Sequence, residues 1–301
     1  MPTDLMQAPV STTRDDIDPA EIASELGTPV RLKTWSLIVT FFGDAVLPRG
    51  GSVSAVSLGQ VMERMGVEPG AVRTAVSRLA SDGWIERNRE GRASFYRLAP
   101  YREQSIVDAG RRIYAPAGAA AEKEDGWALA SLPSDMEPER LPRSMIALQK
   151  GWYLIGPDMA DRPSSMMVFQ GNFEQKPAWF MEMLAPQAQA EAMERLMEIF
   201  YPVLQSVQQG WKPQPVDALA LRCLLIHDWR RIVLRLNALP ASLLPEDWPE
   251  GECRKMVAEL YQGLLAPSEA WLSTVAQCEA GHLPAAKPFL FDRFRASALD
   301  D

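Results

Sequence analysis

Apolar residues at helical spacing predict two short helices between residues 57 and 81. The first begins at Ser57, whose hydroxyl can accept a hydrogen bond from a free backbone N–H of the first turn, and it ends at Gly66. The turn VEPG follows, because Pro69 cannot continue the first helix and its fixed φ suits the start of a second. The second helix covers residues 71–81 and has an apolar face formed by Val72, Ala75, Val76 and Leu79. This pattern predicts a helix-turn-helix.

The next segment, residues 84–98, has the pattern of a β-hairpin. The runs WIER and ASFYRL flank the turn sequence NREG. Arginines occur along both strands and in the turn, at positions 87, 89, 92 and 97. A hairpin directly after a helix-turn-helix predicts a winged helix, in which the second helix enters a DNA groove.

The outer face of the second helix carries cationic and short polar side chains. Arg can form two hydrogen bonds with guanine, and Ser or Thr can serve several base edges. Taken alone, this face is equally well explained as the solvated side of an ordinary amphipathic helix. The arginines of the adjacent hairpin favour DNA binding instead. The residues that we expect to contact DNA are Arg73, Thr74, Ser77, Arg78, Arg87, Arg89 and Arg92.

The patterns around this module predict further elements of an α+β protein. Residues 1–29 are polar and acidic without sustained periodicity, which is typical of a disordered tail. The winged-helix domain is expected over residues 30–115, with a first helix over 30–42, a short strand over 53–56 and a closing helix over 100–115.

An Ala- and Gly-rich linker, residues 116–125, separates this domain from a smaller α+β domain over residues 126–176. Strands are expected near residues 127–132, 152–155 and 166–169, with a helix between 137 and 150. A sheet of this size can pair with another copy at its edge, so the domain is expected to support a homodimer.

The remainder, residues 177–280, predicts an all-α domain. Helices are expected over residues 187–209, 216–236, 251–265 and 268–278. The Pro-rich stretch from residue 281 onward is expected to be an exposed tail.

Charge is distributed unevenly along the chain. The 301 residues carry a net charge of −8, which is unfavourable for a DNA-binding protein. Residues 31–115, however, contain 13 Arg plus Lys against 8 Asp plus Glu, whereas residues 116–301 contain 17 against 25. The positive charge is therefore confined to the predicted DNA-binding module, where it can meet phosphates.

The sequence predicts a cytoplasmic protein that is not associated with a membrane. No stretch approaches the roughly 18 apolar residues of a membrane-spanning helix. The N-terminus lacks the basic-then-apolar pattern of a signal peptide. Cys223, Cys253 and Cys278 lie far apart without a CxxC pair, as expected for reduced, mostly buried thiols.

Common enzyme motifs do not occur in the sequence. It contains no GxxxxGKS/T, no GxGxxG after a predicted strand, no HExxH and no GxSxG. Its two histidines, His227 and His282, are too few for a histidine-rich metal site. We therefore expect neither enzymatic activity, nor a cofactor, nor a bound metal.

One polar cluster interrupts an otherwise apolar helix and is a candidate ligand site. It comprises His227, Asp228, Trp229, Arg230 and Arg231, at a position where charge is costly unless it is used or paired. The two arginines could bind a phosphate, with the imidazole or indole beside an aromatic or adenine ring. Alternatively, the aspartate pairs with the second arginine at i,i+3 spacing and with a neighbouring helix.

Three stretches together resemble the PaaX family of bacterial transcriptional repressors. They are AVRTAVSRLASDGW at 71–84, GRASFYRL at 91–98 and LLIHDWRRIVLRLNALPASLLPEDW at 224–248, and the resemblance spans about residues 30–275. It implies an N-terminal winged helix that binds operator DNA, a central ferredoxin-like domain that supports dimer formation, and a C-terminal helical domain. The positions that match the DNA-facing ones of the family are Arg73, Thr74, Ser77, Arg78 and Arg92.

The resemblance also implies a function. Such proteins repress genes of phenylacetate catabolism and are released from double-stranded operator DNA by an aryl-CoA thioester such as phenylacetyl-CoA. Another acyl-CoA or a different effector is the first alternative. A nuclease that uses the central domain, whose fold is similar to CRISPR-associated endoribonucleases, is a second, but the segment PSSMMVFQGNF contains no acid suited to that chemistry. A third is a protein that uses its winged helix for protein contacts.

Overall fold

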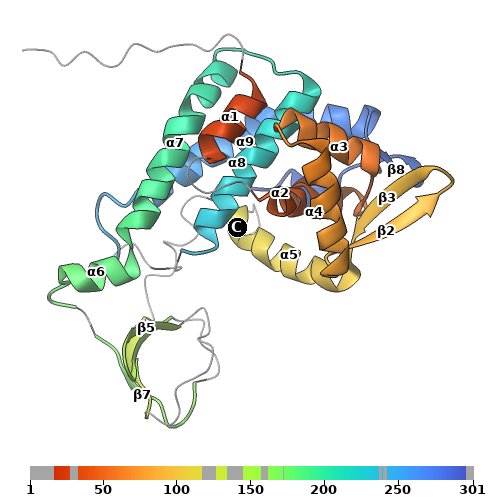
Figure 1. Ribbon diagram of the computed structural model, residues 1–301. Coiled ribbons are helices and arrows are strands. Elements are labelled where there is room, and N and C mark those ends of the chain that lie inside the picture. Colours follow the sequence, from red (N-terminus) through yellow and green to blue (C-terminus); the bar gives the residue numbers. More distant parts are fainter. Residues whose placement is uncertain are drawn as a thin grey trace, which may run out of the picture. The chain divides into compact units, whose positions relative to one another are not determined.

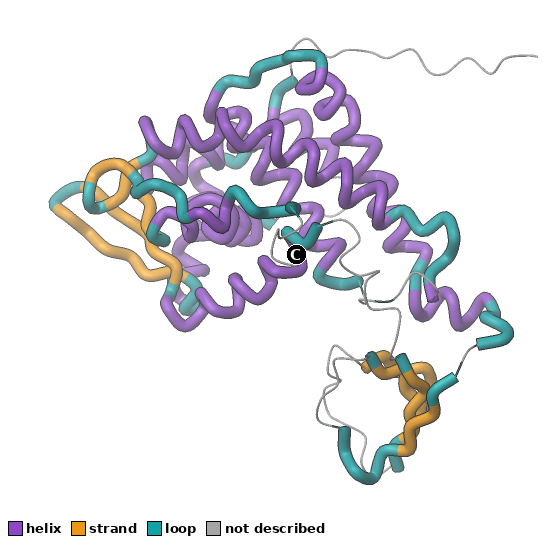
Figure 2. The backbone as a smooth tube through the Cα atoms, turned by 180° about the vertical axis from the view of Figure 1, so that it is seen from behind, coloured by secondary structure: helices purple, strands orange, loops and turns teal. Residues whose placement is uncertain are grey.

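The computed structural model describes residues 17–27, 33–116, 127–133, 145–156, 162–171, 173–236, 239 and 243–295. Helices and small sheets both occur in these ranges, which confirms the expected α+β class (Figures 1 and 2). The chain divides into two compact units. The first is drawn from residues 1–107, 196–228 and 256–290, and the second from residues 108–195, 229–255 and 291–301. The first unit thus joins segments that the sequence patterns assign to separate winged-helix and helical domains.

The first unit contains the predicted winged helix. Its elements are α2 (Thr34–Phe41), a π-helical turn (Phe42–Val46), a 3-10 turn (Leu47–Arg49), β1 (Ser52–Ser54), α3 (Ala55–Arg64), α4 (Pro69–Ser81), β2 (Ile85–Glu90) and β3 (Ala93–Leu98), followed by the start of α5 (Pro100–Ile113). The three strands form an antiparallel sheet in the order β1-β3-β2, in which Val53 lies opposite Tyr96 and Ile85 opposite Leu98. Figure 1 shows α4 next to this sheet and α3.

The start of α3 differs from the prediction. Ser54, not Ser57, is the N-cap: its backbone is extended, and its Oγ accepts a hydrogen bond of 3.0 Å from the backbone N–H of Ser57. Ser57 lies inside the first turn of the helix, where its Oγ accepts a 3.0 Å hydrogen bond from the backbone N–H of Gln277. The predicted strand at 53–56 is accordingly shorter and earlier, because the chain turns helical at Ala55.

The expected disordered tail contains a helix. α1 (Pro19–Gly27) buries Ile22, Ala23 and Leu26, and Asp18 accepts a hydrogen bond from the backbone N–H of Ala20 at 3.0 Å. Ile22 and Leu26, four residues apart, form a short apolar stripe that outweighs the acidic composition of the surrounding sequence. The tail residues up to 16 lie outside the described part of the chain.

Three long helices follow the pattern of the C-terminal region, with one difference. They are α7 (Gln187–Gln208), α8 (Pro215–Val233) and α9 (Glu250–Thr274). The sequence predicted two helices where α9 is continuous, and it passes through Pro267. Leu264 and Ser268, on either side of this proline, are fully buried, so tertiary packing holds the helix together despite the missing N–H.

A buried ionic cluster connects segments of the first unit that are distant in the sequence. Arg222 of α8 donates from Nε to Asp44 of the π-helical turn at 2.8 Å and from Nη1 to Glu269 of α9 at 2.9 Å. The Arg49 Nε donates to the same glutamate at 2.9 Å, and the Tyr261 hydroxyl donates to Asp44 at 3.2 Å. Burial alone would lower the pKa of Arg222, but the two carboxylates and the tyrosine raise it well above its usual range, so this guanidinium stays charged.

A small hairpin after α9 packs against the winged-helix sheet. Its strands are β8 (Gln277–Cys278) and β9 (Gly281–His282), and the Glu279 carboxylate between them accepts a hydrogen bond from Ser52. Burial tends to raise the pKa of Glu279, but the bond from Ser52 and the nearby Arg97 lower it. Leu283 and Leu290 are buried beyond this hairpin, so the expected exposed tail is incorrect over these residues: apolar contacts fix them despite the prolines.

The second unit contains an antiparallel sheet of strands β4 (Ala128–Ser131), β5 (Met145–Gln149), β6 (Trp152–Ile155) and β7 (Met167–Phe169). Their order, β5-β6-β4-β7, is that of a ferredoxin-like sheet. Residues 145–149 were predicted to be helical but pair with β6, because Gly151 allows a tight turn at a φ of 74° and brings Ile146 opposite Leu154. The earlier part of that predicted helix, residues 137–144, lies outside the described residues.

Apolar side chains are buried on both faces of this sheet, although the residues of β7 are exposed. One face carries a cluster of Ala128, Ala130, Leu132, Met145, Tyr153, Ile155 and Met166. On the other, Ile146 and Leu154 pack against Phe180 and Leu184 of α6 (Ala178–Leu184). The apolar run at 145–148 fits a short strand as well as a helix, and the contact with α6 selects the strand.

Within the described ranges, none of the helices combines the length and apolar character needed to cross a membrane. The three cysteines are buried and take no part in disulfides, as predicted.

We expect Arg222→Met to lower the free energy of unfolding by about 3–5 kcal/mol, because it leaves two buried carboxylates without their shared cation. Denaturant unfolding followed by circular dichroism measures this loss. The matched control is Arg64→Met, which removes the exposed ion pair of Arg64 with Asp217 and should cost at most about 1 kcal/mol. Equal losses in the two variants would contradict the central role of the buried cluster.

Candidate nucleic-acid interface

The helix α4 has one buried and one exposed face. Val72, Ala75, Val76 and Leu79 are buried, which fixes the helix against the winged-helix core. Gly66, with a φ of 73°, follows the end of α3, as predicted, whereas α4 begins at Pro69, two residues before the expected start at residue 71. All four side chains that the sequence assigned to DNA on this helix are exposed, namely Arg73, Thr74, Ser77 and Arg78.

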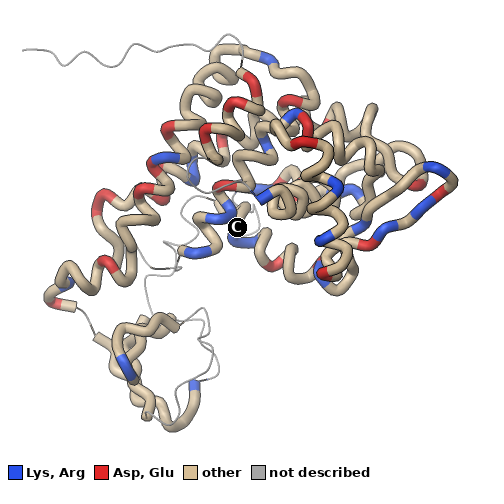
Figure 3. Tube along the Cα trace, viewed as in Figure 1, with Lys and Arg blue, Asp and Glu red and all other residues tan. Residues whose placement is uncertain are grey.

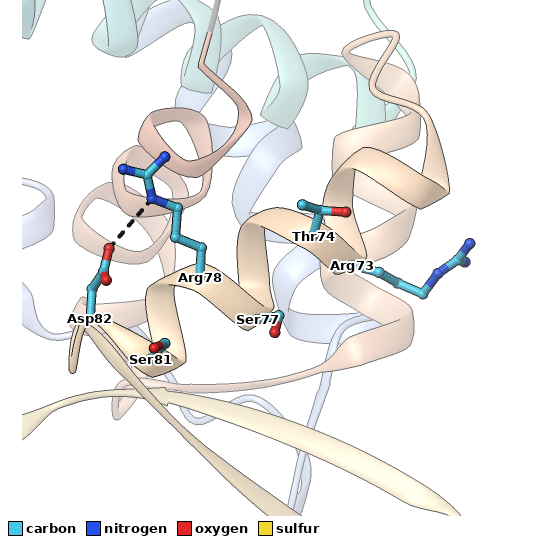
Figure 4. Close-up of a pocket in the computed structure, with 6 residues that line it drawn as sticks. All are labelled: Arg73, Thr74, Ser77, Arg78, Ser81 and Asp82. Atoms are coloured by element: carbon cyan, nitrogen blue, oxygen red, sulfur yellow. Dashed lines mark ion pairs between the residues drawn. The ribbon is translucent and has the colours of Figure 1, made fainter.

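These exposed side chains line a shallow, open hollow together with Ser81 and Asp82 (Figure 4). The Thr74 Oγ1 donates to the Gly70 carbonyl at 3.0 Å, which fixes its rotamer and leaves the oxygen able to accept a bond. Arg78 Nε lies 3.5 Å from a carboxylate oxygen of Asp82. The hollow therefore offers cationic donors, hydroxyl groups and one carboxylate on the face of a single helix.

The β2–β3 hairpin brings further arginines to the surface of the first unit, as the blue segments along it show (Figure 3). Arg87, Arg89 and Arg92 are exposed. The Arg87 Nη2 donates to Ser94 on the neighbouring strand at 2.8 Å, which orients its guanidinium across the hairpin. Gly91, at a φ of 59°, forms the tip with Arg92 directly after it. The hairpin thus has the form and charge of a wing that can contact phosphates.

Sequence reasoning missed several residues of this surface. Ser81 and Asp82 follow Ser77 and Arg78 by four residues, so helical spacing could have placed them on the same face. Arg102, at the start of α5, packs on aromatic rings outside this hollow: its guanidinium lies 4.5 Å from the ring centroid of Trp84 and 5.1 Å from that of Tyr101. That arrangement depends on tertiary packing, for which the sequence carries no local signal.

The polar cluster of α8 is built into the protein core. His227 is 1% exposed, and its Nδ1 lies 3.1 Å from the Thr40 hydroxyl oxygen, which itself donates to Ser36. Trp229 is fully buried, donates from Nε1 to the Ile113 carbonyl at 2.9 Å and lies under the Arg254 guanidinium. Both rings are thus held by protein partners.

The two arginines of that cluster are less enclosed. Arg230 and Arg231 are half-buried. Burial lowers the pKa of Arg230 to about 10, with Tyr114 opposing the shift and Arg231 adding to it, so the Arg230 guanidinium remains cationic at neutral pH. A ligand role for His227, Trp229, Arg230 and Arg231 stays a prediction.

No group of three or more His, Cys, Asp or Glu side chains suited to a metal ion occurs among the residues that the structure describes.

Two family models and one relative match this chain. Residues 33–101 match the family model described as PaaX-like protein, and residues 185–274 match the PaaX-like protein C-terminal domain. A relative named transcriptional repressor PaaX, from Escherichia coli strain K12, is 28% identical over 284 residues, which cover 86% of this chain and 89% of that protein. The matched regions contain the exposed helix α4, the wing and the buried ionic partners on α8 and α9. The chain therefore belongs to the PaaX-like protein family.

Proposed function

We propose that this protein is a DNA-binding transcriptional repressor with α4 as its recognition helix and the β2–β3 hairpin as its wing. The exposed face of α4 carries the proposal, because its opposite face is buried while four side chains suited to base edges and phosphates point outward. The similarity to a protein named as a transcriptional repressor supports it. In this proposal the protein acts by occupying operator DNA and not by catalysis.

The residues of the interface have different tasks in this proposal. Arg73 and Arg78 contact base edges in the major groove, with Thr74 and Ser77 between them. Arg87, Arg89 and Arg92 contact phosphates, which positions the protein without selecting sequence. The wing and helix together explain why the basic charge of the chain is concentrated around them.

We further propose a homodimer that binds a pseudo-palindromic operator. The sheet of the second unit, in the proposed central domain of residues 126–176, has two edge strands, β5 and β7, that a second copy could extend. Two-fold symmetry would then place two recognition helices on half-sites about 34–36 Å apart, or a multiple of this distance. In this proposal the chain has two further domains, a winged-helix domain of residues 30–115 and a helical domain of residues 177–280.

The proposed signal is an aryl-CoA thioester such as phenylacetyl-CoA, and the proposed targets are genes of phenylacetate catabolism. Arg230 and Arg231 supply the cationic charge that phosphates of such a ligand require. His227 and Trp229 would act by fixing this segment of α8, since both rings are packed against protein groups. Release of DNA requires that the ligand bind more tightly to the conformation that does not fit the operator.

Arg73→Ala should weaken binding to a selected operator by about 1–3 kcal/mol and relax base preference at one position of each half-site. Fluorescence anisotropy with labelled duplexes measures both effects. The control is Arg195→Ala, which removes an exposed arginine from α7. If both variants bind like the unmodified protein, α4 is not the recognition helix.

Arg89→Ala should weaken binding to operator and random DNA by the same factor and reduce the slope of log affinity against log salt by about 1, because a phosphate contact carries no sequence information. Titrations at several salt concentrations provide the slope. A loss confined to the operator would reassign Arg89 to base recognition.

Phenylacetyl-CoA should release the protein from its operator in a gel-shift assay, whereas phenylacetate and coenzyme A added separately should not. Arg231→Ala should raise the concentration needed for release about tenfold, as expected for the loss of one charge-assisted hydrogen bond. Unchanged release in that variant would remove Arg231 from the ligand site. Release by a different acyl-CoA alone would replace the proposed effector.

A further inference from the structure

The last turn of α4 holds an acidic residue at a place where a negative charge is doubly unfavourable. Asp82 is the C-cap of the helix, where the partial negative charge of the helix dipole repels an anion. Among the six residues that line the exposed hollow of α4, it is the one acid. A DNA phosphate approaching this surface would also be repelled by it.

Asp82 forms an ion pair with Arg78, four residues earlier on the same helix. The pair is exposed, with 69% of the arginine and 53% of the aspartate side chain accessible, and Nε lies 3.5 Å from Oδ2. An exposed i,i+4 pair of this kind adds little to the stability of a helix. The small stabilisation from this pair therefore does not account for an aspartate at position 82. The carboxylate also influences the orientation of the Arg78 guanidinium.

The ion pair engages one particular edge of the guanidinium group. Nε is the nitrogen that forms the ion pair with Asp82, and the two terminal nitrogens, Nη1 and Nη2, lie beyond it along the side chain (Figure 4). These two nitrogens form a planar fork whose spacing matches O6 and N7 of guanine. A carboxylate on the Nε side leaves this fork available for an end-on contact with a guanine edge, and its attraction favours orientations in which Nε, and not the fork, is nearest to it.

We infer that Asp82 is a specificity-determining residue, which orients Arg78 toward guanine and repels DNA that does not offer this contact. The inference rests on the proposed function, since it concerns the helix that reads DNA. The terminal nitrogens of Arg78 provide the attractive contact with guanine, and the charge of Asp82 provides the repulsion of other DNA. A residue of this kind lowers affinity for DNA in general and increases the difference between the operator and other sequences.

Two substitutions separate these contributions. Asp82→Ala removes both the charge and the acceptor oxygens, whereas Asp82→Asn removes the charge but keeps an oxygen that can accept from Arg78. The operator is first obtained by selection from a random duplex library with the unmodified full-length protein. Affinities are then measured for the selected duplex, for variants with each guanine replaced, and for random duplex.

Asp82→Ala should reduce the preference for one guanine in each half-site about fivefold, a part of what a bidentate Arg–guanine contact supplies. Its affinity for random duplex should rise roughly threefold at low salt, because one repulsive charge is gone. Asp82→Asn should show the same rise for random duplex but keep more of the guanine preference. In an Arg78→Ala background, Asp82→Ala should no longer change the guanine preference.

Asp108→Ala is the matched control. Asp108 lies on α5, is also 53% exposed and forms a similar helical pair with Arg111, in which Nη1 lies 3.6 Å from Oδ1. Asp108→Ala changes the net charge by the same amount as Asp82→Ala, so an effect of net charge alone would appear in both variants. Thermal unfolding by circular dichroism verifies that each variant is folded.

The outcomes distinguish this inference from the proposed function. If the unmodified protein enriches no DNA sequence, the proposed function fails and the inference fails with it. If it enriches an operator but Asp82→Ala retains the full guanine preference, or behaves like Asp108→Ala, the inference alone is overturned. Loss of preference at one guanine that depends on Arg78 supports it.

Discussion

The guanidinium of Arg222 is completely buried, and a charge in that position requires partners that are buried with it. Its two carboxylates come from distant segments: Asp44 follows the first helix of the winged-helix module, and Glu269 lies near the end of α9. The same glutamate also binds Arg49, so two cations and two anions form one connected group. The α8 and α9 segments of the first unit cannot separate from the winged helix without exposing or orphaning these charges. This constraint explains why the winged helix and these segments of α8 and α9 form a single compact unit.

Other contacts extend this constraint toward the elements that support α4 and the β2–β3 hairpin. The hairpin after α9 contacts the winged-helix sheet at Ser52 and the first turn of α3 at Ser57. His227, at the centre of α8, contacts Thr40 of α2. A displacement of α8 or of the end of α9 would therefore act on the helix and the strand that support α4 and the wing. The contacts that hold the first unit together are thus also the ones that connect α8 and the end of α9 to the elements supporting α4.

The sequence predicts the winged helix well because its signals are local. Helical spacing, Gly66 and Pro69 define α3 and α4 within a few residues, and the turn at Gly91 defines the wing. The ionic cluster has no such signal, because Asp44 and Arg222 are 178 positions apart and neither lies in a charged motif. The errors have the same origin: Met145 and Ile146 become a strand, and α9 continues through Pro267, because of contacts made by residues distant in sequence. Asp82 lies on the exposed face of α4 at i,i+4 spacing from Arg78, but a search of the sequence for groups that bind phosphate does not select an acid.

Contacts between residues distant in sequence also reduce the number of α8 side chains that are available to bind a ligand. A histidine, a tryptophan and two arginines in an apolar helix suggest a ligand when only the sequence is known. In the fold, the imidazole lies beside Thr40 and the indole N–H is used by the Ile113 carbonyl, so two of the four groups already have the partners that burial demands. Only the cationic pair Arg230 and Arg231 retains partial exposure. A ligand at this segment would therefore be recognised mainly through its negative charge, and specificity for an aryl group would have to come from residues outside this cluster.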